Sequence, residues 1–264
     1  MYDFQFHQPQ TLDEALRLLS ESDDGKLVAG GMTLLPTMKQ RLAQPEDLID
    51  LGAVPGLTGI SLEDGQIVVG AMTRHVEVET SEIVRAEIPA LAELAGLIGD
   101  PQVRNRGTIG GSLANSDPAA DYPAAVLALA ATVVTNRRSI AADEYFLDLF
   151  ETALDEDEIV TSIRFTVPRR AAYQKFPNPA SRYAMVGVMV AELNDGIRVA
   201  VTGAGACAFR VASMEDALTA QFAAASVASI SIPDDDLNSD IHASAEYRAH
   251  LVTIMAKRAV AAIA

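Results

Sequence analysis

The chain has 264 residues, 49% of them hydrophobic, which is enough for one large domain or two smaller ones with ample core. Its 36 acidic and 20 basic residues give a net charge of −16, which argues against nucleic acid or an anionic membrane as partner. A single cysteine, Cys207, excludes an intrachain disulfide and an iron–sulfur cluster held by this chain alone. Neither a membrane span nor a secretory leader is visible, so we expect a cytoplasmic protein.

The N-terminal half predicts short helices and strands. Thr11 and Glu14 form a capping-box pattern before a helix whose apolar residues share one face. A hairpin is expected around Asp64-Gly65. The patterns predict strands over 26–29, 47–51, 57–62 and 66–69, and helices over 34–42, 73–80 and 89–98.

The second half begins with residues 99–121, which show neither helical nor strand periodicity. We expect a long loop there, of the kind that is usually functional or disordered. The prolines of 168–181 indicate a linker, and Asn194-Asp195-Gly196 indicates a hairpin. The remaining expected elements are strands over 158–167, 183–193 and 197–202, and helices over 122–131, 214–222 and 244–263.

Two glycine-rich motifs lie far apart in the sequence. The first motif is Ala29-Gly30-Gly31-Met32-Thr33, and the second motif is Thr108-Ile109-Gly110-Gly111-Ser112. Paired glycines let a backbone approach a ligand and present its N–H groups as donors. Two such motifs in one domain predict a long diphosphate ligand held at two places. The first motif also precedes an expected helix, whose N-terminus would favour phosphate, and the chain lacks the lysine motif of nucleotide triphosphatases.

Around these motifs the sequence resembles the FAD-binding medium subunits of molybdenum-containing hydroxylases, the carbon monoxide dehydrogenase and xanthine dehydrogenase group. The resembling segments are Leu27 to Pro36, Asp47 to Leu51, Asp100 to Gly111 and Asn115 to Pro123, with an N-terminal Phe4…Pro9…Leu12 pattern. The resemblance implies an α+β fold that begins with a two-lobed FAD-binding domain of the vanillyl-alcohol-oxidase (PCMH) type over 1–168. Its lobes would cover about 1–55 and 56–168. A C-terminal domain with a three-stranded antiparallel sheet and helices would follow over 169–264.

The resemblance also implies roles for individual residues. The first motif would hold the pyrophosphate through backbone N–H groups, and the second motif would form another cradle against the diphosphate and the flavin side. Asp121 would accept hydrogen bonds from ribityl hydroxyls, a role that suits a carboxylate. Tyr183 would lie near the isoalloxazine ring, with packing in the core as its alternative. Family members often carry other residues at Met32 and Thr33. Met32 cannot donate a hydrogen bond, so backbone contacts are expected there, and the hydroxyls of Thr33 and Ser112 are candidate additional donors.

The function implied by the resemblance is electron transfer. The chain would bind FAD and pass electrons from a partner's [2Fe-2S] clusters to an external acceptor. The partners would be an iron–sulfur small subunit and a molybdopterin large subunit, in a dimer of heterotrimers. No catalytic acid or base is then needed in this chain. The alternatives are a free-standing FAD-dependent oxidase or reductase, for which no general base stands out, and a non-catalytic FAD-binding or assembly module.

Other patterns favour structural interpretations. Residues 203–208 formally fit a dinucleotide-binding fingerprint, but they follow an antiparallel hairpin rather than a βαβ unit. The histidines His7, His75, His242 and His250 are scattered, so we expect surface or loop positions and no metal site. The acidic runs 155–158 and 234–236 predict solvated turns. Arg104 and Arg106 face phosphate or a partner subunit, or else form structural salt bridges.

Overall fold

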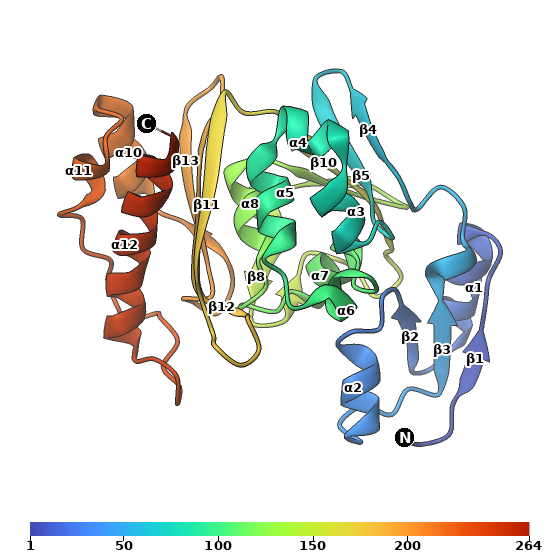
Figure 1. The fold of residues 1–264 in the computed structure, drawn as a ribbon. Helices are drawn as coiled ribbons and strands as arrows, with labels where there is room; N and C mark the ends of the chain where they lie inside the picture. Colours follow the sequence, from blue (N-terminus) through green and yellow to red (C-terminus); the bar gives the residue numbers. More distant parts are fainter. Residues whose placement is uncertain (264) are drawn as a thin grey trace.

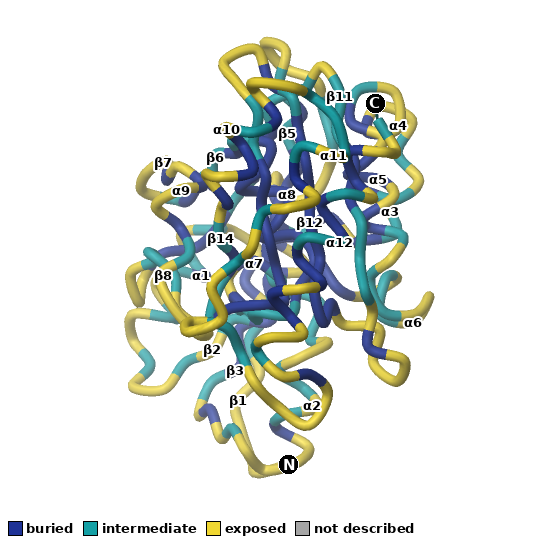
Figure 2. The backbone as a smooth tube through the Cα atoms, turned by 90° about the vertical axis from the view of Figure 1, so that its left-hand side faces the viewer, coloured by how far each residue is buried: buried dark blue, intermediate teal, exposed yellow. Residues whose placement is uncertain are grey.

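A computed structural model describes residues 1–263. They form an N-terminal lobe, a central lobe and a C-terminal domain (Figure 1). The expected α+β class is confirmed. Buried backbone is concentrated in the central lobe and in the sheet of the C-terminal domain, whereas the periphery of the N-terminal lobe is mostly exposed (Figure 2). No helix within residues 1–263 has the length and apolar character needed to cross a membrane.

The N-terminal lobe is a three-stranded parallel sheet of order β1-β3-β2 with flanking helices. The helix α1 begins where predicted, because the Thr11 side chain accepts a hydrogen bond from the Glu14 amide. The helix α2 ends earlier than expected, and Arg41 follows it in a left-handed conformation with φ of 61°. The elements are β1 (Gln5–His7), α1 (Leu12–Glu21), β2 (Gly25–Val28), α2 (Leu34–Lys39), β3 (Asp47–Asp50) and the 3-10 turn η1 (Leu51–Ala53).

The central lobe is built on a five-stranded antiparallel sheet of order β4-β5-β10-β6-β7. The predicted hairpin between β4 and β5 is confirmed, and both residues of its turn, Asp64 and Gly65, have positive φ. The elements that the sequence patterns predict here are β4 (Ile60–Glu63), β5 (Gln66–Gly70), α3 (His75–Thr80), α5 (Pro89–Gly96), α8 (Tyr122–Ala128) and β10 (Val160–Thr166).

The expected loop over 99–121 is wrong, because α6 (Pro101–Arg104) and α7 (Ile109–Asn115) lie within it. Two glycines lower the helix propensity of α7. A Thr108 cap and the fully buried side chains of Ile109 and Leu113 fix the helix instead. Other short elements without a clear sequence pattern are α4 (Glu82–Glu87), β6 (Thr132–Thr135), β7 (Ser139–Ala141), α9 (Ala142–Tyr145), β8 (Phe146–Asp148) and β9 (Glu151–Thr152).

The expected linker over 168–181 is also wrong, because most of it forms the strand β11 (Arg170–Pro177). This strand lies at the edge of its sheet and Pro177 is its last residue, a position where a missing N–H is tolerated. The sheet is antiparallel as expected, in the order β11-β12-β13-β14, and its short fourth strand is additional. The other elements are β12 (Ala184–Glu192), β13 (Ile197–Thr202), β14 (Phe209–Arg210), α10 (Ala212–Ala220), α11 (Ala224–Val227) and α12 (Ala245–Ile263).

The C-terminal sheet lies between two layers of helices (Figure 1). The helices α10 and α12 cover its outer face, and α5 and α8 of the central lobe cover its inner face. Tyr173, Met189 and Ala200 of this sheet therefore belong to the same hydrophobic core as the central lobe. The two parts share a core across the boundary proposed at 168/169.

Candidate cofactor site

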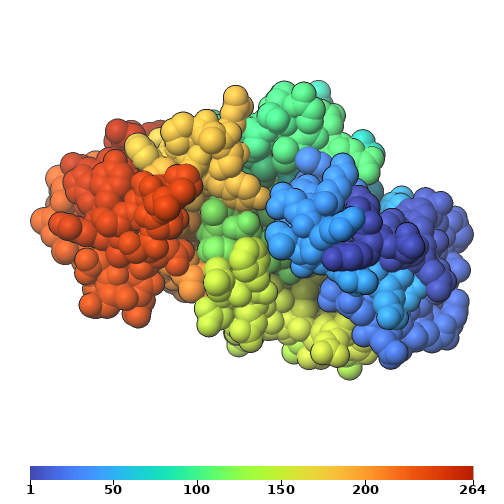
Figure 3. Space-filling model, turned by 90° about the horizontal axis from the view of Figure 1, so that it is seen from below, coloured from blue at the N-terminus to red at the C-terminus, as the bar shows by residue number. Residues whose placement is uncertain are grey.

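A cavity of about 510 Å³ opens where the three parts of the molecule meet. Its size falls within the range of small-molecule sites. Figure 3 views the molecule from below, where atoms of the N-terminal lobe, the central lobe and the C-terminal domain come together. Of the predicted site residues, Ile109 is buried beneath the wall, and the others line the cavity: Ala29, Gly30, Gly31, Met32, Thr33, Thr108, Gly110, Gly111, Ser112, Asp121 and Tyr183.

The first motif presents unbonded backbone donors at the cavity. The amide N–H groups of residues 29–33 donate to no acceptor among the described residues. Gly31 has φ of 69°, a conformation that favours glycine. Thr33 is the N-cap of α2, but its side chain makes no capping hydrogen bond. Consecutive free amides of this kind are able to bind an anion such as a diphosphate.

The second motif forms the first turn of α7, and its amides are already bonded. Those of Ile109, Gly110, Gly111 and Ser112 donate to Thr73 O, Ala71 O, Thr108 Oγ1 and Thr108 O at 3.1, 2.8, 3.2 and 3.0 Å. The amides of 109–112 are thus occupied within the protein, and a second cradle formed by 108–112 stays a prediction. This motif offers the cavity a wall without bulky side chains, together with the hydroxyl of Ser112.

Glycine also lets the two motifs touch each other. A Cβ on Gly30 would overlap the Arg106 carbonyl, which lies just before the second motif. A Cβ on Gly111 would lie 3.2 Å from the Ala29 Cβ and 2.9 Å from Thr108 Oγ1. The close approach that glycine permits is thus an approach between two protein segments, and it makes the motifs adjoining walls of one cavity.

Asp121 is a buried carboxylate in the cavity wall, 4% exposed. Lys175 Nζ lies 2.9 Å from both of its oxygens, and Tyr173 Oη donates to Oδ1 at 2.6 Å. Burial raises the pKa of Asp121, and the charge of Lys175 opposes that rise. A carboxylate has about four acceptor sites. Oδ2, which accepts only from Lys175 within residues 1–263, keeps capacity for a ligand hydroxyl.

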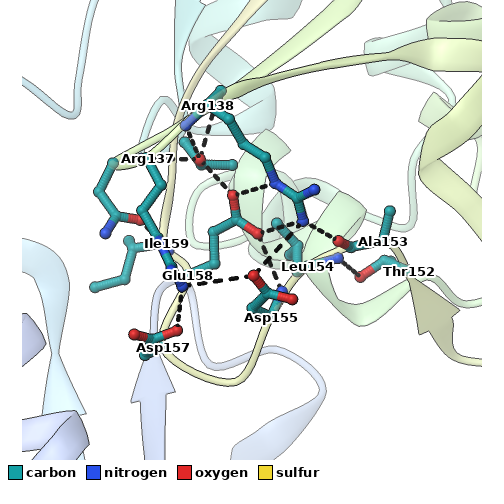
Figure 4. A network of polar contacts seen from close by, with 11 residues as sticks. Arg137, Arg138, Thr152, Ala153, Leu154, Asp155, Asp157, Glu158 and Ile159 are labelled. Carbon is teal, nitrogen blue, oxygen red and sulfur yellow. Dashed lines mark hydrogen bonds and ion pairs between the residues drawn. The ribbon is translucent and has the colours of Figure 1, made fainter.

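Glu158 is a second buried carboxylate in the cavity wall, and its oxygens are saturated (Figure 4). Oε1 accepts from Thr135 Oγ1 at 2.7 Å and Arg138 Nε at 3.0 Å, and Oε2 accepts from Arg138 Nη2 at 2.9 Å and the Asp155 amide at 3.0 Å. The hydrogen bonds from Arg138 are the largest cause that lowers the pKa of Glu158 to about 2. The predicted solvated turn at 155–158 is therefore wrong for Glu158, which fixes the shape of this wall.

His75 lines the cavity, although the sequence predicts a surface or loop position. The residue is 5% exposed, its ring lies 5.4 Å from that of Tyr122, and its Nδ1 has no hydrogen-bond partner in the described chain. Burial, aided by the charge of Arg104, lowers the pKa of His75 to about 4. The imidazole is neutral at pH 7 and a weak general base. An isolated histidine in the sequence gave no signal of this position.

The remaining candidates separate into the cavity rim and the scaffold. Tyr183 is 43% exposed at the rim, so the alternative that it packs in the core is wrong. Arg104 Nε lies 2.8 Å from Glu79 Oε2, which makes it a structural salt bridge. Arg106 lines a smaller neighbouring cavity of about 380 Å³.

Residues 203–208 follow the antiparallel strand β13 and take no part in the cavity lining. Within residues 1–263, no group of three or more metal-ligating side chains is placed to hold an ion.

Comparison with known proteins agrees with this geometry. Residues 2–169 match the family described as the FAD binding domain in molybdopterin dehydrogenase. The carbon monoxide dehydrogenase medium chain of Hydrogenophaga pseudoflava is 39% identical, over 97% of this chain and 96% of its own. The nicotine 6-hydroxylase medium subunit of Paenarthrobacter nicotinovorans is 36% identical, over 97% of this chain and 95% of its own.

Solved structures show the same fold over nearly the whole chain. Carbon monoxide dehydrogenase from Hydrogenophaga pseudoflava aligns with a TM-score of 0.90 and 38% identity, covering 99% of this chain and 97% of that one. Quinoline 2-oxidoreductase from Pseudomonas putida 86 aligns with a TM-score of 0.90 and 26% identity, covering 99% and 96%. The family resemblance predicted from the two motifs is confirmed.

Proposed function

This chain belongs to the family of FAD-binding domains of molybdopterin dehydrogenases, and on that premise we propose that it is the FAD-binding electron-transfer subunit of a multi-subunit molybdenum hydroxylase. The observation that carries the proposal is the run of unbonded amides at 29–33 beside a cavity of about 510 Å³. Backbone donors of this kind bind phosphate without a lysine.

The residues present fit FAD in three respects. The amides of the first motif would hold the diphosphate, and the open acceptor site of Asp121 Oδ2 suits a ribityl hydroxyl. Tyr183, at the rim, would lie beside the isoalloxazine ring. Bound FAD supplies the redox chemistry, since it accepts and releases electrons singly or in pairs. The chain itself binds the cofactor, orients it and screens it from water.

Electron transfer suits this cavity better than direct oxidation of a small molecule. Among residues 1–263, His75 is the one histidine that lines the cavity, and its pKa of about 4 makes it a poor base at neutral pH. The relatives are medium subunits of a carbon monoxide dehydrogenase and a nicotine hydroxylase. We therefore assign the iron–sulfur clusters and the molybdopterin to small and large partner subunits, in a cytoplasmic dimer of heterotrimers that serves an external acceptor.

Purification from the native source tests the proposal. Affinity capture of the full chain should bring down two partner chains, one with iron–sulfur clusters and one with molybdopterin, and stoichiometric FAD should appear in the absorbance spectrum. Mass spectrometry identifies the chains, and extraction identifies the flavin. An intact complex without flavin would contradict the proposal. So would an isolated chain that binds FAD and oxidises a small molecule by itself, which would favour the oxidase alternative.

A further inference from the structure

The segment between α7 and α8 is held by the C-terminal domain. Three consecutive carbonyls of this segment accept hydrogen bonds from that domain: Pro118 O from Gly203 N at 2.7 Å, Ala119 O from Ala184 N at 3.1 Å, and Ala120 O from Thr202 Oγ1 at 2.6 Å. The next residue is Asp121, whose carboxylate is bonded by Tyr173 and Lys175 of β11. Four residues in a row, of which Ala120 and Asp121 line the cavity, thus depend on the C-terminal domain for their position.

Lys175 and Tyr173 are placed to serve Asp121. The Lys175 side chain is 3% exposed, and its ammonium bonds only the central lobe within the described residues, at Asp121 and at Leu97 O, 3.0 Å away. Tyr173 crosses the neighbouring strand at Gly187, where a Cβ would overlap its phenol. Both side chains therefore reach out of their own sheet to the cavity wall.

A buried carboxylate is costly unless it is paired and hydrogen-bonded. We propose that Lys175 and Tyr173 are positioning residues of the cofactor site, which hold the Asp121 carboxylate as an acceptor for the ribityl chain. This inference rests on the proposed function. The C-terminal domain then completes a cofactor site to which residues 2–169, the extent of the family match, contribute only part.

Titration of the full chain with FAD across pH 5.5–8.5 tests the inference. At pH 7, Lys175→Met should weaken FAD binding about 10- to 100-fold, since hydrogen bonds to charged groups are worth this much. The loss should grow as the pH falls, because the unpaired carboxyl takes up a proton and loses an acceptor site. The wild-type affinity should change less over this range, because the charge of Lys175 opposes protonation of the carboxyl. Lys175→Arg should restore most of the affinity, and Tyr173→Phe should show a smaller loss of the same sign.

Two controls separate positioning from a general loss of structure. Arg170 is on the same strand and pairs with Glu192 away from the cavity lining, so Arg170→Met should leave FAD affinity unchanged. Asp121→Asn removes the group through which Lys175 acts. In that background, Lys175→Met should change affinity by less than about twofold, as expected for strongly coupled residues.

The outcomes are distinguishable. If the wild-type chain and its native complex bind no FAD, the proposed function fails. If the wild-type chain binds FAD and Lys175→Met loses nothing, the inference fails. An equal loss at every pH, repeated in full in the Asp121→Asn background, also overturns it, because a purely structural lysine behaves that way. If thermal unfolding shows that Lys175→Met does not fold, Tyr173→Phe with and without Asp121→Asn gives the same test.

Discussion

The two glycine motifs resemble each other in sequence, yet their backbone amides differ in hydrogen bonding at the same cavity. The amides of 29–33 have no protein acceptor within the described chain, whereas those of 109–112 all donate to protein oxygens. Glycine makes room for protein atoms around both motifs, since Gly30 lies against the Arg106 carbonyl, Gly110 against Ala71 and Gly107 against His75. A glycine pair therefore indicates a close approach, but it does not say whether the neighbour is ligand or protein.

The largest effect is expected from a side chain in the second motif. A Cβ on Gly110 would collide with the Ala71 backbone, so Gly110→Val should lower the free energy of unfolding by about 3 kcal/mol or more. Urea unfolding of the FAD-free chain measures this loss. A variant that kept wild-type stability and lost only FAD binding would show that the glycines of both motifs serve the cofactor, which would contradict this difference between them.

The first motif should show the reverse behaviour. Gly31 has φ of 69°, and an alanine there costs about 1–2 kcal/mol of backbone strain, which the turn relieves by moving its free amides. We expect Gly31→Ala to weaken FAD binding roughly tenfold, or about 1.4 kcal/mol, while the chain stays folded. Gly65→Ala is the matched control, because Gly65 also has positive φ but lies in open space at the β4–β5 turn. Equal FAD affinities in the two variants would count against the cradle.

A pair of threonines sharpens the contrast. Thr108 caps α7 by accepting from the Gly111 amide, whereas Thr33 at the start of α2 makes no such bond. Thr108→Val should therefore lower the free energy of unfolding by about 1 kcal/mol, and Thr33→Val should change it by less than about 0.5 kcal/mol. Chemical denaturation of both variants measures the two changes in the free energy of unfolding. Equal losses would mean that the two threonine side chains stabilise their helix N-termini equally.

The smallest effect is expected in the pH dependence of stability, through His75. The folded-state pKa of His75, about 4, is below its ordinary value of 6.5, so its contribution to stability is complete above pH 6.5 and is lost progressively toward pH 4. At pH 6.0 the wild-type chain should have lost roughly 0.5–1 kcal/mol more than His75→Leu, relative to pH 7.5. Denaturation at both pH values measures the difference. Parallel pH profiles would show that His75 is not buried beside the second motif.

Local signals predicted much of the fold. The cap of α1 and the hairpin between β12 and β13 follow from residues adjacent in sequence, and both are confirmed. The helix α7 and the strand β11 escaped prediction, because core packing and a sheet edge override their glycines and prolines.

The candidate site was predicted in part, for a related reason. The motifs named residues that line one cavity, but whether an amide is free depends on partners far away in the chain, such as Thr73 O and Ala71 O. Nothing in the sequence indicated that Lys175 belongs to the site, because only the packing of β11 against the central lobe brings this side chain to Asp121. Glu158 was hidden in an acidic run whose other members give no hint of its burial.

Hydrogen exchange of the full chain, with and without FAD, tests the central claim most directly. The amides of 29–33 should exchange fast in the free chain and slow markedly when FAD binds. Those of 109–112 should already be slow and change little, because their donors are bonded within the protein. Protection that appears at 109–112 while 29–33 stays unchanged would contradict the account.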